Sequence, residues 1–231
     1  MQRGGRRFKD AVYEQFARIG KGLASPTRLE LLDLLSQGEH VVEDLSRLTG
    51  ETVANVSQHL QVLRRSRLVD CRKEGLYVRY RLAAPAVGEF MRGLRLLAEQ
   101  QLDELERARR SLLASWREAE AVDRDELVRR VREGEAAVID VRPVEEYRAA
   151  HLPKAMSLPL EELEERMAEL PSDCEVVAYC RGPYCVLALE AVTLLRKRGY
   201  RAFRLDMGVW DWRARGLPVE GECAHAEGRN R

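Results

Sequence analysis

Two cysteines, Cys180 and Cys185, share a short loop that reads Tyr179-Cys-Arg-Gly-Pro-Tyr-Cys-Val186. The β-branched and apolar run 175–179 predicts a buried strand that ends at Cys180. The residues from about 185 to 198 have helical spacing, so the loop is expected to lead into the N-terminus of a helix. Backbone N–H groups and the helix dipole at such a terminus favour a thiolate over a thiol. We therefore expect Cys180 to be a nucleophile held in a cradle of backbone amides. The rest of this expected active-site loop is Arg181, Gly182, Pro183, Tyr184 and Val186.

Each of the two cysteines also has a less reactive interpretation. Cys180 could be a buried structural cysteine, because free cysteine is often simply a core residue. Gly182 permits unusual backbone angles and Pro183 stiffens the chain, which favours a built loop around a reactive thiol. Cys185 could resolve a persulfide or sulfenate at Cys180 by forming a disulfide. It could equally be a cysteine packed in the first turn of the following helix.

The elements around the loop alternate between helix and strand, which predicts an α/β unit with a mostly parallel sheet. The expected helices cover about 123–132, 161–170 and 185–198, and the expected strands cover 137–140, 156–159, 175–179 and 201–205.

The first part of the chain has a different pattern, with helices near residues 8–19, 26–38, 42–48 and 52–63 followed by a β-hairpin over about 68–82. Two short helices followed by a hairpin are typical of a winged helix-turn-helix. The second helix would enter the major groove of DNA with its N-terminal end. Its readers would be Thr52, Asn55, Ser57, Gln58 and His59. The basic contacts would come from Arg64, Arg72, Lys73, Arg79 and Arg81.

The charge distribution supports double-stranded DNA as a partner. Residues 1–115 hold 20 Lys and Arg against 15 Asp and Glu, whereas residues 116–231 hold 19 against 23. The net charges of +5 and −4 sum to the formal +1 of the whole chain. Seven basic and only two acidic residues lie between 52 and 82, which places the positive charge on the predicted hairpin and its helix. A solvated charged surface is the alternative.

An apolar stripe follows the hairpin over about residues 85–116 and predicts one long helix. Its members are Val87, Phe90, Met91, Leu94, Leu97, Leu102, Leu105, Ala108 and Leu112. One small domain cannot cover a stripe of this length, so we expect a homodimer through the 85–115 helix. Packing on its own domain is the alternative for the first turns.

A chain of 231 residues is long enough for two domains. We expect domains at 1–115 and 123–220, a linker at 116–122 and a tail at 221–231. No apolar run approaches the 18 or more residues that a membrane span needs. The five cysteines and the absence of a signal-peptide pattern favour free thiols in the cytoplasm.

Residues 16–101 resemble an ArsR-type winged-helix repressor. The matching segments are Leu23-Ala-Ser-Pro-Thr-Arg-Leu29, Asn55-Val-Ser-Gln-His-Leu60 and Gly75-Leu-Tyr-Val-Arg-Tyr80. Many members of that family sense metals through a Cys-x-Cys pair before the recognition helix. The corresponding segment here is Glu39-His-Val-Val-Glu-Asp-Leu45, which lacks both thiolates. We therefore expect no metal and no cofactor.

Residues 123–219 resemble rhodanese-like sulfurtransferase domains. The matching segments are Ile139-Asp-Val-Arg142, Glu145-Glu-Tyr147, His151-Leu-Pro-Lys-Ala155, the cysteine loop and Gly208-Val-Trp210 with Trp212. Lys154 and Val209 stand where the family usually has glycine. The resemblance implies that Cys180 carries sulfane sulfur as a persulfide and that Asp140 and Arg142 help to order the site. Rhodanese-type phosphatases need Cys-x5-Arg, but Val186 occupies the arginine position, so Arg181 should line the mouth of the loop instead.

Three functions follow from these two resemblances. The first is a repressor whose DNA binding is controlled by a small sulfur donor or an oxidant that modifies Cys180, with Cys185 as its candidate partner. The second is a sulfurtransferase enzyme tethered to a DNA-binding module. The third is an interaction protein with an inactive rhodanese fold.

Overall fold

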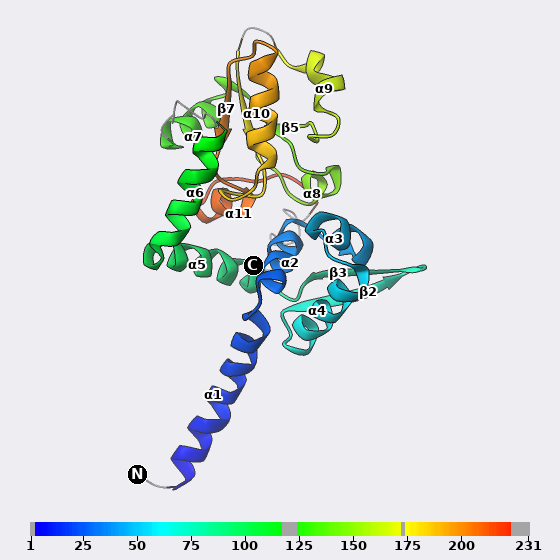
Figure 1. The fold of residues 1–231 in the computed structure, drawn as a ribbon, viewed down its shortest axis with the longest axis vertical. Helices are drawn as coiled ribbons and strands as arrows, with labels where there is room; N and C mark the ends of the chain where they lie inside the picture. Colours follow the sequence, from blue (N-terminus) through cyan, green and yellow to red (C-terminus); the bar gives the residue numbers. More distant parts are fainter. Residues whose placement is uncertain (1–2, 117–123, 172–173, 223–231) are drawn as a thin grey trace. The chain divides into compact units, whose positions relative to one another are not determined.

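A computed structural model describes residues 3–116, 124–171 and 174–222, and it divides into two compact units, Met1–Leu94 and Arg95–Arg231 (Figure 1). Most of the predicted linker at 116–122 and of the predicted tail at 221–231 lies outside the described residues. The domain limits at 115 and 123 therefore stay a prediction. Within the described part of the chain, no helix combines the length and the apolar character needed to cross a membrane.

The first unit is a winged helix-turn-helix, as the sequence predicts. Its helices are α1 (Arg3–Leu23), α2 (Pro26–Gln37), α3 (Val42–Thr49), α4 (Val53–Arg65) and the start of α5 (Pro85–Gln101). Its strands are β1 (His40–Val41), β2 (Val69–Glu74) and β3 (Tyr77–Leu82), and they pair antiparallel in the order β1-β3-β2. The β2–β3 hairpin projects from the helices of its unit (Figure 1).

Apolar residues at helical spacing build the core of this unit and fix the two short helices against each other. The fully buried side chains include Leu31, Leu32, Leu45, Val56, Leu60 and Leu63. Gly50 ends α3 in the left-handed conformation, with φ of 71°. The Thr52 hydroxyl then accepts a hydrogen bond of 3.2 Å from the Asn55 backbone N–H and caps α4, as predicted.

The second unit contains a parallel four-stranded sheet in the order β5-β4-β6-β7, which confirms the predicted α/β class. The strands are β4 (Ala136–Asp140), β5 (Met156–Ser157), β6 (Glu175–Tyr179) and β7 (Ala202–Leu205). The helices are α6 (Asp103–Ser115), α7 (Arg124–Glu133), α8 (Val144–Ala149), α9 (Leu163–Arg166), the 3-10 turn η1 (Met167–Glu169), α10 (Leu187–Lys197) and α11 (Val209–Ala214).

Both faces of this sheet are buried, which explains why β6 is apolar from Val176 to Tyr179. Val176, Ala178 and Cys180 belong to the core cluster that includes α10, which lies against β6 and β7 (Figure 1). Val177 and Tyr179 belong to a second cluster with residues of α7 and α11. The alternation along one strand therefore sends Cys180 and Tyr179 to opposite faces.

The prediction of one long helix over 85–116 is wrong in one respect, because the structure has two helices there, α5 and α6. Leu102 adopts an extended conformation, with φ of −120° and ψ of 97°, and separates the two helices. Asp103, Glu104 and Glu106 then fill the first turn of α6, where acidic side chains stabilise a helix start. Neither glycine nor proline marks the break in the sequence. Apolar periodicity alone does not predict it.

Candidate functional site

Cys180 directly follows the carboxyl end of β6, an interior strand of the sheet between β4 and β7. Open parallel sheets place their reactive groups at this end of the strands. Cys180 is only 1% exposed. The loop from Cys180 to Val186 then leads into α10, as the sequence predicts, although the helix itself starts at Leu187.

The loop folds back on itself, so that Cys185 lies beside Cys180. The Cys185 N–H donates to the Gly182 carbonyl at 3.2 Å. The Cys180 thiol donates to the Cys185 carbonyl at 3.5 Å and lies 3.9 Å from the Gly182 carbonyl. The geometry therefore brings together the two cysteines that the sequence singled out.

Gly208 supports the loop from a later part of the chain. A Cβ atom at Gly208 would lie 2.0 Å from the Arg181 carbonyl oxygen, a distance that no side chain can occupy. The close approach of these two backbone segments therefore requires glycine at position 208.

The two thiols have opposite electrostatic environments. Burial raises the pKa of the Cys180 thiol well above its ordinary value, and the neighbouring Cys185 raises it further. Cys185 is partly exposed, and its pKa is lowered to about 6 because the Cys180 thiol and the backbone N–H groups of Arg181 and Leu187 hydrogen-bond to its sulfur. Backbone N–H groups of Ala188 and Gly182 lower the pKa of Cys180, as the expected cradle of amides implies, but burial of the thiol outweighs them.

Arg181 anchors the loop. Its Nε and Nη2 atoms donate to the Glu146 carboxylate at 3.0 Å and 2.6 Å. Glu146 is fully buried and the Arg181 side chain is 13% exposed. This ion pair holds the guanidinium against α8, and the expected place of Arg181 at the loop's mouth stays a prediction.

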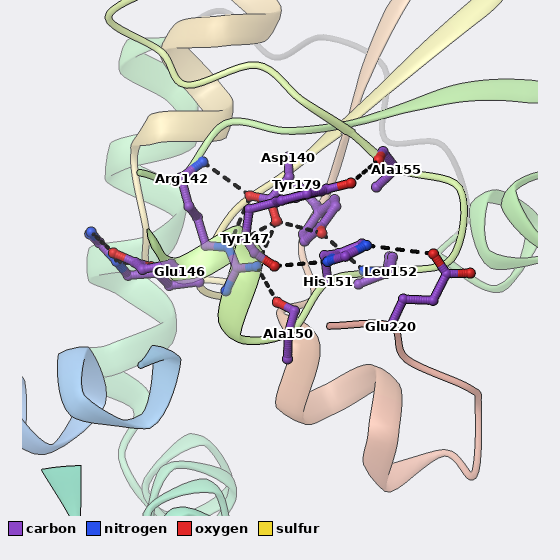
Figure 2. A network of polar contacts seen from close by, with 11 residues as sticks. Asp140, Arg142, Glu146, Tyr147, Ala150, His151, Leu152, Ala155, Tyr179 and Glu220 are labelled. Atoms are coloured by element: carbon purple, nitrogen blue, oxygen red, sulfur yellow. Dashed lines mark hydrogen bonds and ion pairs between the residues drawn. The ribbon is translucent and has the colours of Figure 1, made fainter. Parts of the chain in front are cut away.

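Asp140 and Arg142 form a buried polar network at the end of β4 (Figure 2). The Arg142 Nη2 atom donates to Asp140 Oδ2 at 2.6 Å and to the Ala150 carbonyl at 2.8 Å. Burial alone would lower the pKa of Arg142, but the Asp140 carboxylate outweighs it and raises this pKa, so the guanidinium stays charged. The Tyr179 hydroxyl donates to Asp140 at 2.5 Å and accepts from the Leu152 N–H at 3.0 Å. The network thus holds Tyr179, the residue before Cys180, in one position.

The C-terminal half of α5 lies against the loop within the second unit. The Tyr184 hydroxyl donates to the Glu99 carboxylate at 3.0 Å. Burial and this contact raise the pKa of Tyr184 to about 12, so the hydroxyl keeps its proton near neutral pH. Arg95 forms an ion pair with Asp211 of α11, and its Nη1 atom is 3.7 Å from the position of a Cβ at Gly182.

The predicted DNA readers lie on and beside α4. Thr52, Gln58 and Arg64 are exposed, whereas Asn55, Ser57 and His59 are partly buried. The Asn55 side-chain amide donates to Glu51 at 2.6 Å. This contact uses one donor of a side chain that we expected to read a base edge.

The wing carries its predicted basic residues, but acidic neighbours neutralise part of that charge. Arg72 pairs with Glu39 at 3.0 Å, and Arg81 lies 3.8 Å from the same carboxylate. Arg79 pairs with Glu74 at 2.5 Å. Glu39 lies outside residues 52–82, the segment over which the charges were counted. Its pairing with Arg72 and Arg81 could therefore not be predicted from that count. Lys73 is exposed on β2.

Sequence reasoning missed the residues that connect the loop to the rest of its unit. Glu146 appears in the sequence only as one of two adjacent glutamates, and Asp211 and Glu99 appear as ordinary surface charges. Their pairing with Arg181, Arg95 and Tyr184 depends on tertiary contacts between distant segments. Among the described residues, no three of His, Cys, Asp and Glu gather in a group that could hold a metal ion.

Each half of the chain matches a known protein family. Residues 25–70 match the family described as "Bacterial regulatory protein, arsR family", and residues 123–215 match the "Rhodanese-like domain" family. The chain is 43% identical over 212 residues to the HTH-type transcriptional regulator Rv0324 of Mycobacterium tuberculosis, and the match covers 92% of this chain and 93% of that protein.

Two further similarities cover one half each. A sulfurtransferase of Allochromatium vinosum is 32% identical over 100 residues, which are 42% of this chain and 92% of that protein. The homodimeric winged helix-turn-helix DNA-binding domain Mb0332 of Mycobacterium bovis is 39% identical, with a TM-score of 0.39, over 41% of this chain and 87% of that one. The relative from Mycobacterium tuberculosis matches through both halves, and this chain therefore belongs to the arsR family of HTH-type transcriptional regulators and carries a rhodanese-like domain.

Proposed function

We propose that this chain is a repressor whose affinity for DNA is controlled by a sulfane-sulfur donor or an oxidant that modifies the Cys180 loop. One observation carries the proposal. The loop that holds Cys180 and Cys185 is hydrogen-bonded, through Tyr184, to Glu99 on α5. A covalent change at either thiol would alter the loop's backbone hydrogen bonds and with them the end of that helix.

Helix α5 gives this change a route toward the DNA-reading elements. Its first turns carry Val87 and Met91, which pack against the core formed by α2, α3 and α4. Its last turns carry Arg95 and Glu99. A continuous helix transmits a shift at one end to the other more faithfully than a loop does, because its backbone hydrogen bonds resist bending.

The working unit we propose is a homodimer in the cytoplasm that binds double-stranded DNA. Large apolar side chains are exposed on α1, on α5 and at Leu102, and a second copy of the chain would cover them. They are Phe8, Tyr13, Phe16, Phe90, Leu97 and Leu102, with exposed fractions between 49% and 70%.

The proposal is tested by titrating a DNA fragment from the region upstream of the chain's own gene with reduced, persulfidated and oxidised protein. We expect Cys180→Ser to bind this DNA with wild-type affinity and to stay bound when glutathione persulfide is added. Cys174→Ser, which changes a partly buried thiol outside the loop, is the matched control and should release DNA as the wild type does.

Release of DNA by Cys180→Ser at wild-type donor concentrations would overturn the sensor assignment. Rapid turnover from thiosulfate to cyanide, together with a DNA affinity that does not respond to sulfur loading, would favour the tethered sulfurtransferase instead.

A further inference from the structure

We propose that the tip of the β2–β3 hairpin binds DNA by an apolar contact, in which Leu76 inserts as a wedge between two base pairs of the minor groove. The inference uses only the DNA binding of the HTH-type regulators to which this chain belongs. It is independent of the sulfur chemistry proposed for Cys180, so each proposal can fail without the other.

An apolar patch, formed by Leu76, Tyr77 and Val78, lies at the tip of the hairpin. Leu76 is 97% exposed, Tyr77 58% and Val78 38%, and Leu76 is the most exposed large apolar side chain of the described residues. The hairpin projects from the helices of its unit (Figure 1), which leaves the three side chains open to solvent. Consecutive exposed apolar residues of this kind mark an interaction site.

The turn of the hairpin requires a glycine but not a leucine. Glu74 and Tyr77 form the last pair of the ladder, and Gly75 and Leu76 connect them. Gly75 has a φ of 60°, the left-handed conformation that glycine supplies in two-residue hairpin turns. Leu76 has no positive φ, and small or polar residues are the usual choice in turns. The local fold therefore does not explain an apolar side chain at position 76.

Ion pairs within the unit engage arginines of the hairpin. Arg72 donates to Glu39 at 3.0 Å, and Arg79 donates to Glu74 at 2.5 Å. Each pair reduces the charge that the hairpin offers to phosphate groups, which supply the salt-dependent part of DNA affinity. Lys73 is exposed and forms no ion pair with any described residue. The hairpin thus presents Lys73 as an unpaired cation beside the apolar patch.

Charge favours DNA over a protein as the molecule that covers the apolar patch. Residues 52–82 contain α4 and the hairpin and hold seven basic and two acidic residues, to which Glu39 adds a third acidic one. The segment therefore stays complementary to a polyanion after its ion pairs have formed. Thr52 and Gln58, two exposed members of the predicted DNA readers, belong to the same compact unit as the patch.

A helix and a hairpin of one unit meet different grooves of the duplex. The major groove, about 12 Å wide, is filled by the α-helix that enters it. With α4 in the major groove, the hairpin packed beside it contacts the adjoining minor groove. Proteins that bind there often insert an apolar side chain between base pairs, which partly unstacks them and bends the duplex. Leu76 has the exposure and the apolar side chain for this role.

DNA affinity at several salt concentrations separates an apolar contact from an ionic one. The full-length chain is titrated with a duplex that the wild-type protein has selected from a random-sequence pool. We expect Leu76→Ser to bind at least about tenfold more weakly, because a leucine side chain is no longer buried against DNA. The slope of log Kd against log salt should not change, because no phosphate contact is lost.

Two further variants complete this measurement. Lys73→Gln is the matched control and should lower the salt slope by about one, because it removes a phosphate contact beside the apolar patch. Leu76→Met should stay within about threefold of the wild-type affinity, because methionine also inserts between base pairs. Both positions are exposed, so all three variants should unfold at the wild-type temperature.

Bending of the duplex tests the wedge directly. A duplex with a fluorescence donor and an acceptor at its two ends is saturated with protein, and energy transfer rises when the ends approach each other. We expect a rise with wild type and with Lys73→Gln, and a smaller rise with Leu76→Ser at equal saturation. The selected duplexes should also share a flexible TA or CA step at one fixed position.

Uracil in place of thymine identifies the groove, because it removes the methyl group from the major groove and leaves the minor groove unchanged. We expect the difference in affinity between wild type and Leu76→Ser to persist in uracil DNA. Loss of that difference would show that Leu76 touches a thymine methyl group, and the wedge would be wrong.

Three other outcomes would overturn the inference. Leu76→Ser could bind with wild-type affinity, or it could lose affinity together with a lowered salt slope. A loss of affinity that accompanies a loss of self-association in sedimentation equilibrium would assign the apolar patch to a contact between copies of the chain. None of these measurements uses a sulfur donor, so they leave the proposed sensor in place, and release of DNA by Cys180→Ser leaves the wedge in place. If the wild type selects no duplex, both proposals fail.

Discussion

At the scale of single residues, the chemical state of each thiol is set by a few backbone groups. The two cysteines are five residues apart, yet Cys180 is enclosed by the core, whereas Cys185 is partly exposed just before α10. The loop keeps this arrangement because Arg181 is held on two sides. Its side chain pairs with Glu146, and its carbonyl lies against Gly208, where any Cβ would overlap it.

Replacing Gly208 should therefore disturb the loop from a distance. We expect Gly208→Ala to destabilise the protein by about 1–3 kcal/mol, the usual cost of forcing extra volume into a packed site. The displaced Arg181 backbone would also withdraw its N–H group from Cys185, so alkylation at pH 6.5 should slow. Thermal unfolding and alkylation rates measure the two effects.

Gly93→Ala provides the matched control, because a Cβ at that helical glycine meets no atom within 4 Å. It should leave both quantities close to wild type. A Gly208→Ala protein with wild-type stability and reactivity would show that the loop adapts without its glycine support.

At the scale of elements, the sequence predicted most of what positions the site. β6 occupies residues 175–179, as its β-branched run predicts, and the N-cap at Thr52 starts α4 where expected. These elements are specified locally, by periodicity and capping. The short helices α8 and α11, each of six residues, are too brief for periodicity to reveal.

The break at Leu102 and the distribution of charge between the two thiols could not be predicted from sequence. The break lies between two ion pairs to segments distant in the sequence, that of Arg95 with Asp211 and that of Arg109 with Asp206 at 2.9 Å. A helix-dipole argument placed the thiolate on Cys180, the first cysteine of the loop. Burial of that side chain in the sheet outweighs the dipole, and sequence spacing contains no information on burial of this kind.

The contact between the loop and α5 predicts a variant that takes up sulfur normally but releases less DNA in response. Tyr184→Phe removes the hydroxyl that donates to Glu99. This partly exposed hydrogen bond contributes about 1 kcal/mol at most, so folding and sulfur uptake should be unaffected. Sulfur loading should then release less DNA than it does from the wild type, measured by fluorescence anisotropy.

Tyr200→Phe is the control for Tyr184→Phe, because it removes a hydroxyl that donates to the Met167 carbonyl at 3.0 Å, away from the loop. If Tyr184→Phe releases DNA as completely as this control does, the hydrogen bond to Glu99 does not carry the signal.

At the scale of the whole molecule, the chain combines two units of opposite charge, and α5 begins in one and ends in the other. The exposed aromatic residues of α1 are among the largest apolar side chains left uncovered in the first unit. Tyr13 and Phe16 pack edge to face with ring centroids 5.8 Å apart, yet each remains more than 60% exposed. Exposed apolar surface of this kind marks an interaction site, and the proposed homodimer would cover it.

The double variant Phe16→Ser, Leu97→Ser should therefore weaken self-association. Both side chains are more than half exposed, so the monomer fold should be preserved while apolar area is lost from the interface. We expect sedimentation equilibrium to show a dimer for the wild type and a dissociation constant at least about tenfold higher for the variant, as a loss of about 1.4 kcal/mol would produce.

Gln15→Ser, on the exposed surface of α1, should leave the dissociation constant unchanged. A wild-type chain that sediments as a monomer at micromolar concentration would contradict the proposed dimer.

The position of Gly208 also bears on how the protein is made. The glycine that supports the cysteine loop follows the loop after one helix and one strand, and the β-bridge between His151 and Glu220 closes the unit later still. During synthesis, both cysteines therefore leave the ribosome before the segment that shapes their surroundings. A nascent chain would carry two ordinary thiols, and their separate environments would arise only when the last part of the domain has folded onto the loop. The chemistry of the site therefore depends on the folding of a segment that is made after the cysteine loop.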